Sequence, residues 1–268
     1  MTNHKTIYTK KRRLKKSVII ISGIVLLTIA TYSTISLSSS ILAWNDKKTP
    51  PKDIPNKDIP NDVVEQPTPN DQWNDPVTDD YFKDALFIGD SRTQGFIIYT
   101  GLETNAYVST GLTVDTALTK DIGFDQYGHA TTLEEGLKQN QYQKIYIMLG
   151  INELGWIYPN IFIEHYQTLI ETIQSLEPQA DIYVQSILPV TQEKSNNSIY
   201  NNDKINTYND LIKKMATSLN ITYLNVREIM ENENHVLPEE ATSDGIHLTQ
   251  SYCQKWLEYL KTHTLKEK

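Results

Sequence analysis

The sequence predicts an α/β fold in which a five-stranded parallel sheet is covered by helices on both faces. Short runs of β-branched, aromatic and aliphatic residues alternate along residues 79–268 with longer segments whose apolar residues recur at helical spacing. This alternation is typical of parallel sheets whose strands are connected by helices. Most of the short runs are followed by glycine or proline, which favours a turn directly after the strand.

Five segments have the length and composition of buried strands. They are 85–89 (ALFIG), 106–110 (AYVST), 144–149 (KIYIML), 181–188 (DIYVQSIL) and 221–226 (ITYLNV). Because the carboxyl ends of parallel strands meet at one edge of a sheet, ligands bind there. The residues that directly follow these five runs are therefore the candidates for function.

Three segments carry an apolar stripe at helical spacing. The first runs from Phe162 to Leu176 and ends before a proline, the second from Ile205 to Leu219, and the third from Tyr252 to Leu260. We interpret all three stripes as faces packed on the core. The third contains Cys253, the single cysteine of the chain, which excludes an internal disulfide and a multi-cysteine zinc site, and which we expect to be buried.

The amino-terminal part of the chain is unlike the rest. Residues 1–16 carry seven lysines and arginines and no acidic residue, and residues 17–44 carry no charge. An uncharged stretch of this length can cross a bilayer, and the flanking cations favour an amino terminus in the cytoplasm. We therefore predict a signal-anchor helix over 17–44 and a single-pass protein of the cell membrane. The alternative is a cleaved signal peptide, and in both cases the remainder is exported.

Residues 45–78 read as an extracellular linker, because they are rich in Pro, Asn and Asp and repeat the tetrapeptide KDIP. Such a composition does not form a packed core. The chain without its basic tail carries a net charge of −15. A body this acidic is a poor partner for phosphate backbones, so we expect no binding of nucleic acid.

Residues with a possible catalytic role follow four of the predicted strands. Ser91 comes after the first strand, Gly111 after the second, Asn152 after the third, and Asp244 and His247 lie beyond the fifth. A serine hydroxyl becomes a nucleophile when a histidine takes its proton, and a carboxylate can hold the imidazole in the required tautomer. The backbone N–H groups of Ser91 and Gly111 and the Asn152 amide are candidate donors to an oxyanion. The set predicts acyl transfer.

These residues are also the motif blocks of a known family. The chain resembles the SGNH/GDSL hydrolases, whose first block matches Gly89, Asp90 and Ser91, whose second-block glycine matches Gly111, and whose remaining blocks match 150–152 and 244–247. The resemblance covers roughly residues 83–262. It implies a flavodoxin-like three-layer α/β/α sandwich and serine esterase or acyltransferase activity with no metal and no cofactor.

Two positions depart from the family pattern. Arg92 stands where leucine is usual, and Glu153 stands where aspartate is frequent. Arg92 either pairs with an acidic residue as a structural element or contacts a charged group of the substrate. Trp156 and Tyr158 are further candidates for substrate contact, because aromatic faces suit sugar rings, although such residues more often pack in the core.

The combined expectation is a membrane-anchored enzyme outside the cytoplasm, with a catalytic domain over 79–268. It would remove short acyl groups, above all O-acetyl, from a glycan of the cell envelope. One alternative is an O-acetyltransferase that passes acetyl from a membrane-bound acyltransferase partner to a surface polysaccharide. Another is a non-catalytic surface binding module, which the intact set of Ser, His and Asn disfavours.

Overall fold

The computed structural model describes residues 73, 75–124 and 130–265. The predicted basic tail, the predicted membrane helix over 17–44 and nearly all of the predicted linker therefore lie outside the described residues. Within the described part of the chain, no helix is both long and apolar enough to span a membrane.

The core of the fold is a five-stranded sheet in which every neighbouring pair is parallel, as the sequence predicted. Its strands are β1 (Ala85–Gly89), β2 (Asn105–Val108), β5 (Lys144–Met148), β6 (Asp181–Gln185) and β7 (Thr222–Leu224), in the spatial order β2-β1-β5-β6-β7. The chain moves outward from β1 to β2 and then returns to the other side of β1. This reversal creates a topological switch point between β1 and β5, where open α/β sheets bind their ligands.

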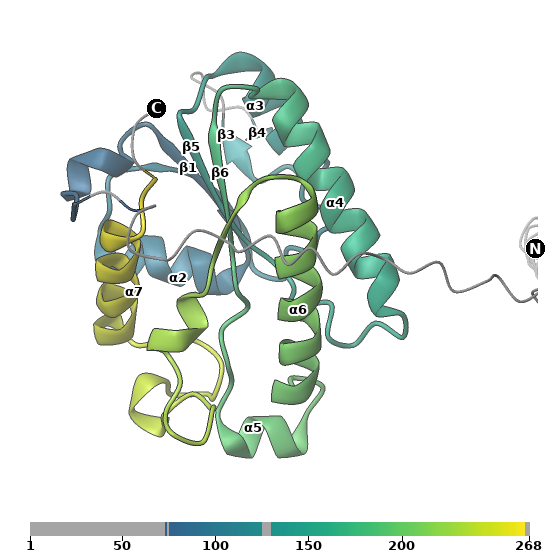
Figure 1. Ribbon diagram of the computed structural model, residues 1–268, viewed down its shortest axis with the longest axis vertical. Coiled ribbons are helices and arrows are strands. Elements are labelled where there is room, and N and C mark those ends of the chain that lie inside the picture. Colours follow the sequence, from purple (N-terminus) through teal and green to yellow (C-terminus); the bar gives the residue numbers. More distant parts are fainter. Residues whose placement is uncertain (1–72, 74, 125–129, 266–268) are drawn as a thin grey trace, which may run out of the picture. The chain divides into compact units, whose positions relative to one another are not determined.

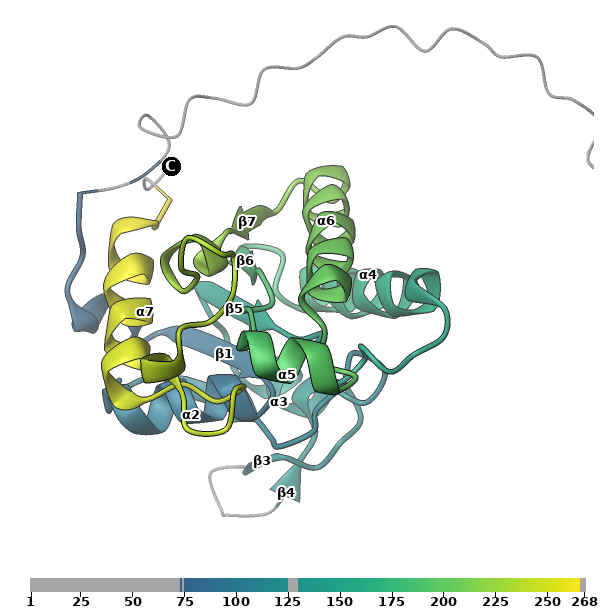
Figure 2. The same ribbon diagram turned by 90° about the horizontal axis from the view of Figure 1, so that it is seen from below.

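Helices cover both faces of the sheet and complete the three layers (Figures 1 and 2). The helices α2 (Ser91–Thr100) and α7 (Gln250–Thr262) lie on one face, and α3 (Leu133–Gln139), α4 (Pro159–Leu176) and α6 (Asn202–Ser218) lie on the other. Side chains of β1 alternate between the two cores: Leu86 and Ile88 enter the core under α4 and α6, while Phe87 packs with Trp256 and Cys253 of α7. Cys253 is buried, as predicted.

Several short elements were not predicted. They are the helix α5 (Gln192–Asn197), the antiparallel pair β3 (Gly123–Phe124) and β4 (Ala130–Thr131), and the 3-10 turns Asp79–Phe82, Val226–Ile229 and Glu239–Ala241. Each is too short to show a clear periodicity. Helix α3 did leave a signal in the sequence, because Thr132 and Glu135 form a capping box at its amino end.

The strand predicted over 181–188 ends early, at Gln185. The last backbone bond from it to β7 joins Ser186 N to Leu224 O at 2.9 Å. The apolar run continues beyond the strand because residues 182–191 are all buried. Side chains of α6 rather than a neighbouring strand bond the backbone at Ile187 and Val190.

Candidate active site

A tight turn places Ser91 at the edge of the sheet. A side chain at Gly89 would overlap Thr93 and approach the carbonyl oxygen of Met148 to 2.8 Å, so only glycine fits at the end of β1. Asp90 caps α2 by accepting a hydrogen bond from the backbone N–H of Arg92 at 2.9 Å. Ser91 is therefore the first residue of α2, where helix geometry leaves its own N–H without an intrahelical acceptor.

Ser91, His247 and Asp244 form a continuous chain of contacts. Ser91 Oγ lies 2.9 Å from His247 Nε2, and His247 Nδ1 lies 2.6 Å from Asp244 Oδ2. The three-residue spacing is explained by a turn in which Asp244 Oδ1 accepts hydrogen bonds from the N–H groups of Ile246 and His247 at 2.9 and 2.8 Å. Gly245 allows this turn through a φ of 84°. The arrangement lets Nδ1 donate to the carboxylate and Nε2 accept the proton of Ser91.

The Asp244 carboxylate is held in its ionised form. Partial burial opposes ionisation, but the hydrogen bonds from the His247 ring and from the N–H groups of His247 and Ile246 outweigh it and lower the pKa of Asp244 well below its ordinary value. A negative charge beside Nδ1 stabilises the imidazolium that forms when His247 takes a proton.

The candidate oxyanion donors lie at the ends of three adjacent strands, β2, β1 and β5. Gly111 adopts a φ of 72° in a turn closed by Leu112 N and Ser109 O at 3.0 Å, and nothing lies within 4 Å of where its Cβ would be. Asn152 Nδ2 donates to Leu112 O at 2.9 Å. This bond uses one amide hydrogen to orient the side chain and ties Asn152 to the Gly111 turn, while the second hydrogen stays available.

Glu153 also supports the turn at Gly111, a role that was not predicted from the sequence. Its side chain is fully buried, and Oε1 accepts a hydrogen bond from Val114 N at 2.7 Å. Oε2 has no partner among the described residues. Burial raises the pKa of Glu153 to about 8, with a further contribution from the nearby carboxyl of Asp90. Asn152 and Glu153 thus fix residues 112–114 together.

Glu153 is expected to make stability depend on pH. The folded carboxyl keeps its proton up to a pKa of about 8, whereas the unfolded one ionises near 4.5. Between these values unfolding releases a proton, so the free energy of unfolding should fall as pH rises, by on the order of a few kcal/mol in total. Glu153→Gln cannot titrate, and its denaturation free energy should change less than that of the wild type between about pH 6 and 8.

Asp90 is the other buried carboxyl nearby, and its titration has to be separated from that of Glu153. Burial raises its pKa only to about 6, so its own contribution is largely lost below the tested interval. Equal slopes for wild type and Glu153→Gln between about pH 6 and 8 would show that Glu153 is not protonated in the folded protein at neutral pH.

Arg92 differs from both sequence-based interpretations. Its side chain is only 3 % exposed, which places the guanidinium away from a substrate. It does act structurally, but its acceptors are backbone carbonyls rather than an acidic side chain: Nη1 donates to Leu188 O at 2.6 Å and Nη2 to Pro189 O at 3.3 Å. Burial lowers the pKa of Arg92 to about 10, and the carboxylates of Asp90 and Asp244 counter this effect, so it remains a cation at neutral pH.

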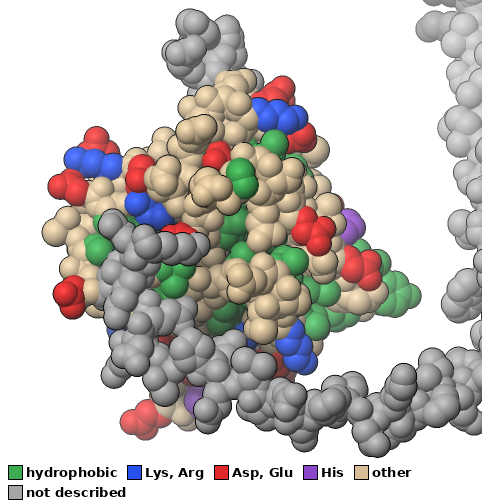
Figure 3. Space-filling view, turned by 45° about the horizontal axis from the view of Figure 1, so that its top comes forward, with side chains coloured by type: hydrophobic (Ala, Val, Ile, Leu, Met, Phe, Trp, Pro, Cys, Tyr) green, Lys and Arg blue, Asp and Glu red, His purple; other side chains and the backbone are tan. Residues whose placement is uncertain are grey.

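The two aromatic candidates have different environments. Trp156 is half-buried against the core and meets the ring of His165 edge-on, with the two ring centroids 5.9 Å apart, which indicates a packing role. Tyr158 is 60 % exposed directly before α4 and is free to meet a ligand. Ile157 and Ile161 are exposed beside it, and Figure 3 shows hydrophobic side chains gathered at the corner where α4 begins.

Two further histidines have ordinary surroundings. His165 is exposed on α4, and His235 Nδ1 contacts Glu231 Oε1 at 2.9 Å. His129 lies outside the described residues.

Comparison with known proteins gives the family of the chain and agrees with its fold. A sequence profile of the GDSL-like lipase/acylhydrolase family matches residues 87–252. The chain belongs to this family. Membership of this family makes the protein a serine esterase of the SGNH/GDSL type. No curated protein sequence gives a significant match to the chain.

Solved structures share the fold at low sequence identity. A protein of Streptococcus pneumoniae, provisionally described as a platelet activating factor, is 23% identical with a TM-score of 0.54, over 67% of this chain and 83% of that one. A protein of Desulfitobacterium hafniense, provisionally described as a lipolytic protein of the G-D-S-L family, is 14% identical with a TM-score of 0.51, over 66% and 97% of the two chains. These likenesses confirm the predicted three-layer α/β architecture.

Proposed function

We propose that the protein cleaves short acyl esters, above all O-acetyl, on a glycan of the cell envelope, with Ser91 as nucleophile, His247 as general base and acid, and Asp244 as the residue that orients the imidazole. The observation that carries the assignment of roles is the unbroken chain of contacts from Ser91 Oγ through the His247 ring to Asp244, at 2.9 and 2.6 Å.

The reaction follows from this geometry in two halves. Ser91 Oγ attacks the ester carbonyl carbon while His247 Nε2 takes the hydroxyl proton, and the oxyanion is stabilised by the N–H groups of Ser91 and Gly111 and the free hydrogen of the Asn152 amide. When the intermediate collapses, His247 returns the proton to the leaving sugar oxygen. Water then attacks the acyl-enzyme by the same steps, which releases the acid and restores Ser91.

The openness of the site supports a polymeric substrate. The side chains of His247 and Asp244 are 48% and 47% exposed, so the ester does not have to enter an enclosed cavity. Tyr158 offers an exposed aromatic face directly before α4, of the kind that sugar rings contact. An acyl group on the surface of a long glycan can reach such a site without the chain being threaded.

The substrate is tested by acetate release. The purified full-length chain would be incubated with an acetylated envelope glycan and with the same glycan after chemical deacetylation, and released acetate would be quantified. We expect acetate from the first glycan only, and none with Ser91→Ala. Hydrolysis of a simple acetyl ester without any release from acetylated glycans would leave the esterase in place and reject the glycan substrate.

Transfer to a sugar hydroxyl is the second candidate, because an open rim admits an acceptor as readily as water. In that case a membrane-bound O-acyltransferase would supply the acetyl group. Supplying an acetyl donor together with a deacetylated polysaccharide would distinguish the two reactions: a transferase acetylates the polymer, whereas a hydrolase releases acetate into solution.

The location is also a proposal. The uncharged stretch 17–44 behind seven cations supports a single-pass anchor with the amino terminus in the cytoplasm and the domain outside. Protease added to intact cells should then degrade the domain. Protection of the domain in intact cells and digestion only after lysis would contradict this orientation.

Asn152→Ala is expected to lower kcat by roughly 10²–10³, the usual effect of losing one oxyanion donor. The hydrogen bond from the Asn152 side-chain amide to the oxyanion strengthens in the transition state. KM should change little. Steady-state kinetics on an acetyl ester measure both constants, and a melting curve monitors the lost bond to Leu112 O. A strong rise in KM at unchanged kcat would make Asn152 a substrate-binding residue instead.

A further inference from the structure

Arg92 places a charged side chain where burial of the charge costs free energy. Its guanidinium is buried beside the first turn of α2, and a buried charge is unfavourable unless hydrogen bonds compensate it. Leucine, the usual residue of the family here, would bury an apolar side chain without that cost. What arginine adds is a pair of hydrogen bonds, to the carbonyl oxygens of Leu188 and Pro189 at 2.6 and 3.3 Å.

The segment that accepts the hydrogen bonds of Arg92 is also bonded to the loop that carries His247. Thr191 N donates to Gly245 O at 3.1 Å, and Gly245 lies between Asp244 and His247. The same segment accepts a hydrogen bond at Val190 O from Leu237 N, also at 3.1 Å. Residues 188–191 are therefore bonded on one side to the residue after Ser91 and on the other to the turn that carries His247.

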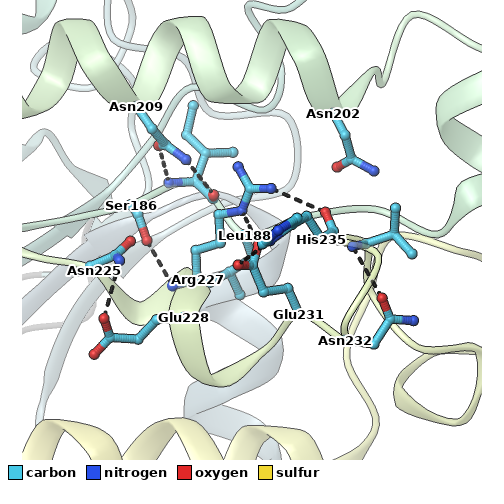
Figure 4. A network of polar contacts seen from close by, with 12 residues as sticks. Ser186, Leu188, Asn202, Asn209, Asn225, Arg227, Glu228, Glu231, Asn232 and His235 are labelled. Atoms are coloured by element: carbon cyan, nitrogen blue, oxygen red, sulfur yellow. Dashed lines mark hydrogen bonds and ion pairs between the residues drawn. The ribbon is translucent and has the colours of Figure 1, made fainter.

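This segment is itself fixed to α6. Asn202 accepts from Val190 N at 3.0 Å and donates to Val190 O at 2.9 Å. Directly before the segment, Asn209 binds Ile187 N and O in the same way at 2.7 and 2.9 Å. Figure 4 shows the two hydrogen bonds of Asn209, with Leu188 and Asn202 nearby. Because Val190 is bound at both its N–H and its C=O, the segment 188–191 behaves as a rigid support rather than a loose loop.

We propose that Arg92 is a positioning residue that sets the distance between Ser91 and His247 through the segment 188–191. The proposal rests on the proposed function, since it takes Ser91 and His247 as the reacting pair. These residues are 156 positions apart and meet at a half-exposed rim. A misplacement of about 1 Å between reacting groups can cost about 10²-fold in rate.

The first test is Arg92→Met, which keeps an unbranched apolar stem and removes both donors. With 4-nitrophenyl acetate as substrate, at a temperature where melting curves show the variant folded, we expect kcat to fall about 10- to 100-fold with KM near the wild-type value. Arg92→Lys should recover part of the loss, because an ammonium can reach one of the two carbonyls. Wild-type kcat in folded Arg92→Met would overturn the proposal.

The matched control is Asn209→Ala. It also removes a buried pair of hydrogen bonds, but from Ile187, directly before the segment 188–191, and among the described residues these bonds lead neither to Ser91 nor to the turn of His247. We expect a lower melting temperature with kcat close to wild type. A loss of kcat equal to that of Arg92→Met would mean that general loosening of the segment, and not the connection through Arg92, controls the rate, which would also overturn the proposal.

A second variant tests the other end of the connection if Arg92→Met fails to fold. Thr191 has a φ of −62°, which proline can adopt, so Thr191→Pro removes the N–H to Gly245 O without forcing this dihedral. It should lower kcat as Arg92→Met does, whereas Thr191→Ala, which keeps the N–H, should lose much less. Equal activity of the two Thr191 variants would contradict the proposed route.

Failure of the proposed function is recognised separately. A fluorophosphonate reagent should label wild-type Ser91 and leave Ser91→Ala unlabelled. Absence of this difference would reject Ser91 as nucleophile whatever the Arg92 variants do. If the difference is present, labelling of Arg92→Met should be slowed in proportion to its kcat, and an unchanged labelling rate would reject the positioning role alone.

Discussion

Ser91→Ala is expected to abolish ester hydrolysis while the protein stays folded. Ser91 begins α2 at a partly exposed rim, and its hydroxyl contacts the His247 ring at 2.9 Å. Removing the hydroxyl therefore opens no cavity in the core but leaves no nucleophile. Loss of a triad nucleophile typically costs well over 10³-fold in kcat. Hydrolysis of an acetyl ester and a melting curve measure the two parts of the prediction.

Ser218→Ala is the control for this substitution. Ser218 ends α6, and its hydroxyl donates to Met215 O at 2.8 Å, so the variant also loses one hydroxyl and one hydrogen bond. It should keep its activity. Residual activity of Ser91→Ala above about a thousandth of wild type would argue against a covalent serine mechanism.

His247→Ala and Asp244→Ala are expected to differ in severity. His247 moves the proton in both halves of the reaction, so its loss should be about as damaging as that of Ser91, on the order of 10⁶ in kcat for a fully coupled triad. Asp244 orients the ring and stabilises its charge without exchanging a proton, and its loss should cost nearer 10⁴. Measuring kcat/KM for both variants from about pH 5 to 9, with melting curves, tests the ranking.

The structure adds a second role for Asp244 that the ranking has to separate. Its Oδ1 accepts hydrogen bonds from the two backbone N–H groups of the turn, while Oδ2 contacts the His247 ring. Asp244→Asn keeps an oxygen for the turn and loses the charge, so it isolates the electrostatic role. If folded Asp244→Ala is as inactive as His247→Ala, the division of roles is wrong. Near-wild-type activity of His247→Ala would reject acyl transfer through this residue altogether.

The sequence predicted the sheet well where burial and composition coincide. The run 85–89 matches β1 residue for residue, because it is buried on both faces and bounded by a glycine. The run 181–188 misled about the end of β6, since hydrophobicity reports burial and not strand pairing. At Ile187 and Val190 the backbone bonds to side chains of α6, and no apolar pattern distinguishes that from a sheet ladder.

The candidate site was predictable for residues whose chemistry is tied to position. Ser91 and Asn152 closely follow predicted strands, so parallel topology brings them to one edge of the sheet. His247 lies in the loop between the last strand and the last helix, and its chemistry as a general base marked it as their partner. The partners of Arg92 had no such signal, because backbone carbonyls are present at every residue and a sequence does not show which are left without a donor. Burial of Glu153 was equally unpredictable, since glutamate is almost always exposed unless it has a partner and the sequence does not show the Val114 N–H that binds it.

The central claim is that an acyl group passes through Ser91, and trapping that intermediate tests it most directly. The protein would be mixed with 4-nitrophenyl acetate, quenched in acid during turnover, digested and mapped by mass spectrometry, with Ser91→Ala in parallel. We expect an acetyl group on Ser91 in the wild type and no acetylated active-site peptide in the variant. Turnover with Ser91 unmodified, or acetylation at another residue that survives in active Ser91→Ala, would contradict the mechanism.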